Sequence, residues 1–151
     1  MQRKNIIDLS LIELEKFCSE LELKPFKAKQ IWNWVYCFGK TNFQEMTNLD
    51  KKTRDFFEEN SFIYRPTINS VHTSNDGTIK WLLEMDDKSL IETVFIPQGK
   101  RGTICISSQV GCTLSCTFCN TGTQKLVRNL STYEILGQIF TVIDHLNDWP
   151  M

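Results

Sequence analysis

Hydrophobic residues recur along the chain at two different spacings, and the spacing changes near residue 65. Before that point they follow the period of three to four residues that is typical of amphipathic helices. Ser10 and Glu13 form a capping box, which predicts a helix directly after Ser10. Further helices are expected over residues 25–38 and 50–59. The side chains expected to face the core in these two helices are Ile31, Trp34, Val35, Phe38, Phe56 and Phe57.

After residue 65, apolar and polar residues alternate with the period of two that is typical of strands. Three strands are expected, over residues 78–85, 89–97 and 103–110. Asp76-Gly77 favours a tight hairpin turn before the first of them, because glycine accepts the positive φ angle of such turns. The second strand is apolar on both sides except at Glu92, which predicts a strand covered on both faces.

A strongly amphipathic helix follows the third strand. Ser131 and Glu134 form a second capping box at its start. The residues that we expect on its buried face are Ile135, Leu136, Ile139, Val142, Ile143 and Leu146. A strand, a loop and a helix in this order form a β/α unit, and α/β enzymes place their chemistry in that loop. We therefore expect an α/β protein with a helical domain (1–64), a β-rich connecting segment (65–97) and the start of a core (98–151).

Three cysteines in the loop of this β/α unit point to a catalytic metal centre. Cys112, Cys116 and Cys119 have the spacing C-x3-C-x2-C. Three thiolates this close together can bind three corners of a cubane iron–sulfur cluster. The fourth iron is then open to a substrate or cofactor, and an open coordination position is typical of catalytic rather than structural metals.

Two other uses of cysteine compete with this interpretation. Six cysteines in 151 residues, with no apolar signal segment at the start, are few for a disulfide-stapled secreted domain. Structural zinc usually takes two C-x2-C pairs, or one such pair with two histidines. The chain has one C-x2-C, and His72 and His145 are far from it in sequence, although Cys105 is available as a fourth ligand. The catalytic cluster accounts best for the spacing.

Charge and hydropathy add two expectations. The formal net charge is −1, and no stretch approaches the roughly 18 apolar residues of a membrane span, so a soluble protein is expected. No acidic residue lies between Glu92 and Glu134. The basic residues of this interval are Lys100, Arg101, Lys125 and Arg128. Such an interval favours an anionic ligand or nucleic acid near the cysteines, although an ordinary solvated loop has the same pattern.

Several segments together resemble one enzyme family. Residues 104–139, ICISSQVGCTLSCTFCNTGTQKLVRNLSTYEILGQI, closely resemble the radical S-adenosylmethionine RNA methyltransferases that act on adenine C2, the RlmN family. Phe118, just before the last cysteine, belongs to the general radical-SAM signature, whereas SSQV and Arg128-Asn129-Leu130 are more specific to this family. FKAKQIWNWVY resembles the family's accessory helical domain, and LIETVFIP resembles the strand that precedes its catalytic core.

The resemblance implies a role for each candidate residue. Cys112, Cys116 and Cys119 would bind a [4Fe-4S] cluster, whose open iron would hold S-adenosyl-L-methionine. Reductive cleavage of that cofactor would yield a 5′-deoxyadenosyl radical. Glu92 matches the family's proton acceptor. Cys105 matches the thiol that forms a transient disulfide with a methyl-carrying cysteine near the family's C-terminus.

The resemblance also implies partners and a location. The substrates would be 23S rRNA and tRNA, the electron donor a protein such as flavodoxin, and the location the cytoplasm, with no membrane association. No cysteine follows Cys119, and the family's later cofactor-binding strands have no counterpart in the chain. We therefore expect the first part of a partial TIM barrel that is inactive alone, with a separately encoded C-terminal half as a candidate partner. A Cfr-like enzyme acting on adenine C8 and a non-catalytic iron–sulfur or RNA-binding remnant are the alternatives.

Overall fold

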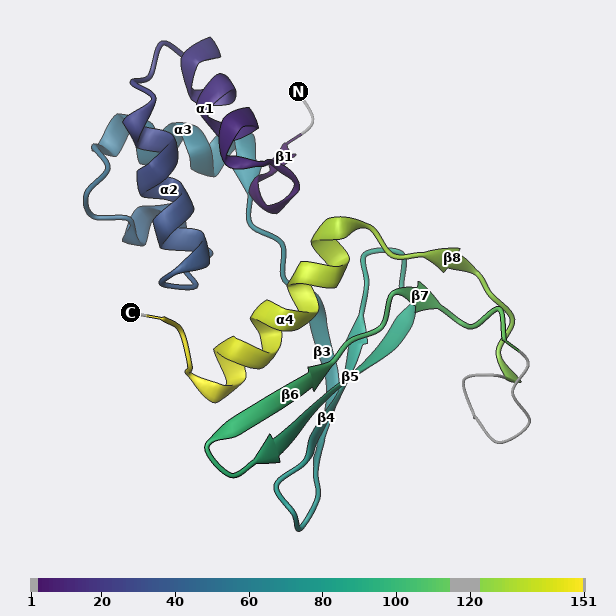
Figure 1. Cartoon of the computed structure of the whole chain (residues 1–151). Helices are drawn as coiled ribbons and strands as arrows, with labels where there is room; N and C mark the ends of the chain where they lie inside the picture. Colours follow the sequence, from purple (N-terminus) through teal and green to yellow (C-terminus); the bar gives the residue numbers. More distant parts are fainter. Residues whose placement is uncertain (1–2, 115–122, 151) are drawn as a thin grey trace. The chain divides into compact units, whose positions relative to one another are not determined.

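The structure is a computed structural model that describes residues 3–114 and 123–150 (Figure 1). The chain divides into two compact units. One, which we call the helical unit, contains the residues up to Tyr64 together with those from Ile143 onward; the other, the sheet unit, runs from Arg65 to Val142. No helix in the described ranges is long and apolar enough to cross a membrane.

The helical unit contains three α-helices and a small parallel strand pair. The helices are α1 (Leu11–Glu20), α2 (Phe26–Tyr36) and α3 (Lys51–Asn60). The shorter elements are β1 (Lys4–Asn5), η1 (Ile6–Asp8), η2 (Phe43–Glu45) and β2 (Ser61–Phe62). Strand β1 pairs in parallel with β2. The three helices predicted from the hydrophobic period are thus confirmed, with ends that differ from the prediction by one or two residues.

Local capping explains where these helices begin. The Ser10–Glu13 capping box is confirmed, because the Glu13 carboxylate accepts the Ser10 N–H at 2.7 Å and the Glu13 N–H is donated to Ser10 Oγ at 3.3 Å. Asp50 caps α3 by accepting the Thr53 N–H at 2.9 Å. Pro25 precedes α2, where its missing N–H leaves no helical hydrogen bond unmade.

Fewer of the aromatic side chains predicted to face the core in and after α2 and α3 are fully buried than expected. Ile31 and Val35 are fully buried, as expected, but Phe38 is 43% exposed and Trp34 is half-buried. Phe38 lies beyond the end of α2, so the helical period no longer sets its direction. Of the neighbouring pair in α3, Phe57 is buried and Phe56 is half-buried, since consecutive helical residues point about 100° apart.

The sheet unit is built around a four-stranded antiparallel sheet in the order β3-β4-β5-β6. The strands are β3 (Thr67–Thr73), β4 (Ile79–Glu84), β5 (Leu90–Gln98) and β6 (Arg101–Cys105). The hairpin turn predicted at Asp76-Gly77 is confirmed, and Gly77 has a φ of +83°. The β-rich segment was predicted to end at residue 97, and this position lies inside β5. The sheet therefore contains residues on both sides of that predicted boundary.

Only one face of the sheet is buried by described residues. Trp81, Leu83 and Thr93 are buried on the face that meets helix α4 (Thr132–Leu146). On the opposite face, Glu92 is exposed and Leu90 is 46% exposed. The prediction that β5 is covered on both faces is therefore wrong for the described part of the chain, because side chains on its second face remain exposed.

The strand predicted over residues 103–110 is two strands. Strand β6 ends at Cys105, and β7 (Gln109–Val110) pairs with β8 (Arg128–Asn129) in a separate antiparallel ribbon. The break has a physical cause: both the N–H and the C=O of Ser107 are hydrogen-bonded to the Gln138 side chain, so they are not available to a neighbouring strand.

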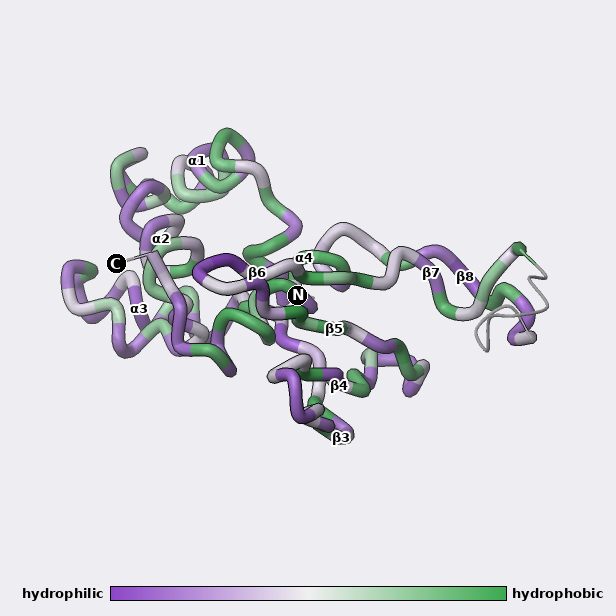
Figure 2. Tube along the Cα trace, turned by 60° about the horizontal axis from the view of Figure 1, so that its bottom comes forward, coloured by the Kyte–Doolittle hydropathy of each residue, from purple (hydrophilic) through white to green (hydrophobic). Residues whose placement is uncertain are grey.

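Helix α4 buries a different face from the one that its hydrophobic pattern predicts. Its fully buried residues are Glu134, Gly137, Gln138, Phe140, Thr141 and Val142. Of the six residues predicted to be buried, only Val142 is, and the others are half-buried. Hydrophobic stretches are visible along α4 in Figure 2. The polar side chains of Glu134, Gln138 and Thr141 can be buried because each of them is hydrogen-bonded.

Candidate active site

Glu92 and Cys105 lie on the same open face of the sheet. Val94 pairs with Lys80 on one side and with Cys105 on the other, so these three residues form a row across β4, β5 and β6. Glu92 is two residues from Val94 and therefore projects from the same face. Both Glu92 and Cys105 line one hollow of about 380 Å³. The structure thus brings together the two residues that the family resemblance singles out.

The Glu92 side chain is held by a lysine. Lys80 Nζ lies 2.9 Å from Glu92 Oε1, and the two side chains are 47% and 53% exposed. An ionised carboxylate of this kind accepts hydrogen bonds. The Glu92 carbonyl oxygen also accepts a hydrogen bond from Ser107 Oγ at 2.8 Å, which ties β5 to the segment after β6.

Cys105 is the last residue of β6, and it is a free, exposed cysteine. Its position differs from that of a buried structural thiol, because the side chain lines the hollow. In 3–114 and 123–150 no three His, Cys, Asp or Glu side chains are grouped to hold a metal ion.

Cys112 directly follows Gly111, which lines the hollow together with Gln124. The Cys112 N–H is donated to the Gln124 carbonyl at 3.2 Å. Gly111 has a φ of +77°, and a Cβ at this position would collide with the Lys125 carbonyl oxygen. The two arms of the loop can therefore cross closely only at glycine.

The surroundings of the Cys112 sulfur fit a cluster ligand. The Leu114 N–H is directed at Cys112 Sγ, with a nitrogen–sulfur distance of 3.3 Å. Hydrogen bonds to the sulfur ligands tune the reduction potential of iron–sulfur clusters. Cys116 and Cys119, the other two predicted ligands, lie outside the described residues.

Arg128 connects the end of the cysteine loop to two acidic residues. Its Nε lies 2.7 Å from Asp87 Oδ2, and its terminal nitrogens lie 2.7 and 2.8 Å from the two carboxylate oxygens of Glu134. Glu134 also supplies the side-chain half of the predicted capping box, because it accepts the Ser131 N–H at 2.8 Å and the Ser131 hydroxyl at 2.9 Å. Arg128 is therefore neutralised within the fold, and it does not add free positive charge to the basic interval.

These contacts shift the protonation of the groups involved. Hydrogen bonds to Glu134 and Asp87 raise the pKa of Arg128. The hydrogen bond from Arg128 holds the pKa of Asp87 well below its usual range. Burial alone would raise the pKa of Glu134, but hydrogen bonds from Arg128 and Ser131 outweigh it and leave that pKa lowered.

Gln138 is a site residue that the hydrophobic pattern did not identify. Its Oε1 accepts from Thr93 Oγ1 at 2.9 Å and from the Ser107 N–H at 2.8 Å, and its Nε2 donates to the Ser107 carbonyl at 2.9 Å. A sequence signal existed: Glu134 and Gln138 are four residues apart in the helix, so they share one face.

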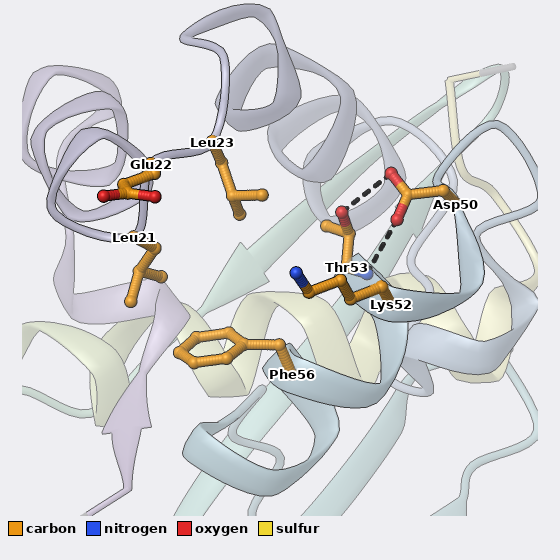
Figure 3. A pocket seen from close by; sticks show the side chains of 7 residues that line it. All are labelled: Leu21, Glu22, Leu23, Asp50, Lys52, Thr53 and Phe56. Carbon is orange, nitrogen blue, oxygen red and sulfur yellow. Dashed lines mark hydrogen bonds between the residues drawn. The ribbon is translucent and has the colours of Figure 1, made fainter.

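The helical unit has a hollow of its own, shown in Figure 3. Leu23 and Phe56 contribute apolar surface to it, and the Asp50 carboxylate at its rim accepts hydrogen bonds from the N–H and hydroxyl of Thr53. Asp50 also pairs with Lys27 at 2.9 Å. Its oxygens are thus engaged in capping α3, and the hollow contains none of the predicted catalytic residues.

Comparison with known proteins identifies relatives of both units. Residues 4–63 match the family described as "Ribosomal RNA large subunit methyltransferase N-terminal domain". The chain is 47% identical over 146 residues to the "Dual-specificity RNA methyltransferase RlmN" of Rhodospirillum rubrum, covering 97% of this chain and 34% of the relative. It is 47% identical over 150 residues to the protein of the same description in Gluconobacter oxydans, covering 98% of this chain and 37% of that protein.

A solved structure is similar as well. The crystal structure of a radical SAM methyltransferase from Sphaerobacter thermophilus matches with a TM-score of 0.86 and 32% sequence identity. The match covers 96% of this chain and 43% of that one. The chain thus spans a little over a third of the length of the curated relatives that it matches.

Proposed function

The chain belongs to the RlmN family, whose N-terminal part it matches, and on this premise we propose that it provides the cluster-binding and RNA-recognising part of an adenine-C2 RNA methyltransferase. The observation that carries the proposal is the shared hollow of the sheet unit. Glu92, Cys105 and two residues of the cysteine loop, Gly111 and Gln124, all border it, although up to 32 positions separate them in sequence.

The residues have distinct roles in this proposal. Cys112, Cys116 and Cys119 would hold a [4Fe-4S] cluster, which would supply an electron for the cleavage of S-adenosyl-L-methionine. Glu92 accepts the proton that leaves adenine C2, and Lys80 holds its carboxylate over the open face. The exposed Cys105 thiol forms the transient disulfide that releases the product. That disulfide needs a second thiol, and residues 120–151 contain no cysteine.

The partners follow from the proposed reaction. Ribosomal 23S RNA and tRNA are the proposed substrates, a flavodoxin-like protein is the proposed electron donor, and the cytoplasm is the proposed location, since its reducing conditions preserve thiolates. In this proposal the second thiol and the later strands of the barrel belong to a portion like the C-terminal part of the longer relatives.

The first experiment tests the cluster. The 151-residue chain is reconstituted with iron and sulfide without oxygen. We expect a brown protein with broad visible absorbance and about four irons per chain, and we expect Cys116→Ala to abolish the colour. A colourless protein that takes up zinc instead would contradict the proposal.

The second experiment tests the reaction. The chain is combined with the C-terminal portion of the Rhodospirillum rubrum relative, reductant, S-adenosyl-L-methionine and RNA. We expect methylation at adenine C2 only when both parts are present. Mass analysis of the modified nucleoside distinguishes C2 from C8, and methylation by the 151-residue chain alone would contradict the proposed division of labour.

A further inference from the structure

Two buried polar side chains of α4, Glu134 and Gln138, hold opposite ends of the cysteine loop. They are four residues apart, so they lie one turn from each other on the same face of the helix. Their exposures are 3% and 0%. Buried polar groups of this kind destabilise a fold unless every donor and acceptor is used, and both side chains meet that condition.

Glu134 holds the end of the loop. Both of its carboxylate oxygens accept hydrogen bonds from Arg128, the residue at which the chain leaves the loop and forms β8. A two-point arginine–carboxylate contact fixes direction as well as distance. Asp87 binds the same guanidinium from the turn between β4 and β5, so the loop end is attached to the sheet as well.

Gln138 holds the start of the loop. Its amide group makes two hydrogen bonds to the backbone of Ser107, one to the N–H and one to the C=O. Ser107 lies between Cys105 and Cys112 in the sequence. The same amide accepts from Thr93, the neighbour of Glu92 on β5. One side chain thus fixes the loop start relative to the strand that carries the proposed base.

Between these two points, the arms of the loop pair with each other. The Leu130 N–H is donated to the Ser108 carbonyl and the Val127 N–H to the Val110 carbonyl, both at 2.9 Å. This ladder ends at Cys112, whose position therefore depends on how both arms are anchored. Since α4 is a continuous helix of 15 residues, its two contacts keep the arms at a fixed separation.

We propose that Glu134 and Gln138 are positioning residues that act together as a clamp on the cluster-binding loop. The inference rests on the proposed function, because it assigns the clamp a role in retaining the iron–sulfur cluster. Residues that orient metal ligands from outside typically change metal affinity by about 10- to 100-fold when they are replaced. A contact that serves only the fold would change the melting temperature without a comparable change in iron release.

The test compares two clamp variants with two matched controls. Glu134→Gln removes the charge that pairs with Arg128, and Gln138→Met removes the amide at nearly constant volume. Glu13→Gln alters the corresponding box residue of α1. Thr141→Val alters a buried polar residue on the same face of α4 that bonds only to the Gly137 carbonyl of its own helix.

Each chain is reconstituted without oxygen, and iron release to a chelator is timed at a temperature at which all the chains are folded by circular dichroism. We expect release about tenfold faster in each clamp variant. The two controls should stay within about twofold of the wild-type rate. Wild-type rates in both clamp variants would overturn the proposal.

Amide hydrogen exchange in the chain without iron gives a readout that is independent of the cluster. The Cys112 and Val127 amides should exchange faster in both clamp variants, while the amides of α3 keep their protection. If the wild-type chain takes up no iron, the proposed function fails, and exchange still decides whether the clamp exists. Faster exchange with unchanged iron release would show a contact that serves only the fold, and would overturn the positioning role.

Discussion

Helices α1 and α4 begin with the same Ser-x-x-Glu box, and the structure uses the two boxes differently. At α1, the carboxylate of Glu13 is exposed, and among the described residues it accepts hydrogen bonds only from Ser10, the N-cap of the same helix. At α4, Glu134 is buried, and it bonds to Ser131 and also to Arg128, which belongs to another element. The first box stabilises only the start of its own helix, whereas the second also joins its helix to the loop of the proposed active site.

The comparison shows what separates a capping contact from a tertiary one. A surface cap exchanges water for a neighbouring side chain and gains little, because water competes for the same groups. A buried carboxylate has no such substitute, so the removal of one partner leaves the other unsatisfied. The same four-letter motif therefore predicts the helix start in both places, but its energetic weight depends on burial.

The largest expected effect is on stability. Glu134→Ala removes a buried partner of Arg128 and should lower the free energy of unfolding by about 2–3 kcal/mol, at the lower edge of the range for broken buried pairs because Arg128 keeps Asp87. Ser10→Ala should lower it by about 1 kcal/mol, the usual value for an N-cap. Urea unfolding of both variants measures the difference, and equal losses would show that burial does not distinguish the boxes.

A smaller effect is expected at Gln138. Gln138→Met leaves the Thr93 hydroxyl and the Ser107 backbone groups without their partner, which should lower the free energy of unfolding by about 2 kcal/mol. Thr141→Val, which disrupts only an intrahelical bond, should lower it by about 0.5 kcal/mol. Thermal unfolding distinguishes the two, and a larger loss at Thr141 would argue that the helix interior, rather than the loop contact, dominates.

The dependence of stability on pH sharpens the comparison further. The pKa of Glu134 lies below its ordinary value of 4.5, so its contribution is complete above that value and is lost as the pH falls through the lowered pKa. Wild-type protein should therefore lose stability below about pH 4.5, and Glu134→Gln should make the profile flatter. Unfolding measured at intervals from pH 6 to 3 tests this, and an unchanged profile in the variant would contradict the assignment.

The smallest effect is expected at the proposed base. Lys80 and Glu92 are both about half-exposed, and exposed ion pairs contribute about 0–1 kcal/mol. Lys80→Met should therefore change the free energy of unfolding by less than about 1 kcal/mol. In the two-part methylation assay, the same variant should reduce turnover, because Glu92 loses the group that holds it. Unchanged turnover would separate Lys80 from the proposed chemistry.

The local parts of this structure could be predicted from the sequence. Both capping boxes, the hairpin at Gly77 and the helices follow from neighbours within four residues, so a pattern along the chain contains the necessary information. The position of Glu92 beside Val94 on one face also follows, because strand residues alternate.

The contacts that shape the site could not be predicted in this way. The bond between Gln138 and Ser107 joins residues 31 positions apart, and the pairing of β7 with β8 depends on both arms of a loop folding together. The apolar pattern of α4 predicted the wrong buried face. Such a pattern identifies hydrophobic side chains, but it contains no information on which polar side chains are hydrogen-bonded in the fold. The resemblance to known enzymes located Glu92 and Cys105, whereas the geometry was needed to identify their neighbours.

The close crossing at Gly111 makes the spacing of this segment intolerant to insertion. Adding a single residue between Val110 and Cys112 would shift the alternation of the ribbon by one and turn the first cysteine toward the opposite side. The glycine would also move away from the Lys125 carbonyl, and a bulkier residue would be forced against it. Length variants of the protein should therefore be tolerated at the hairpin tips, such as Asn75-Asp76, and be rejected at this crossing.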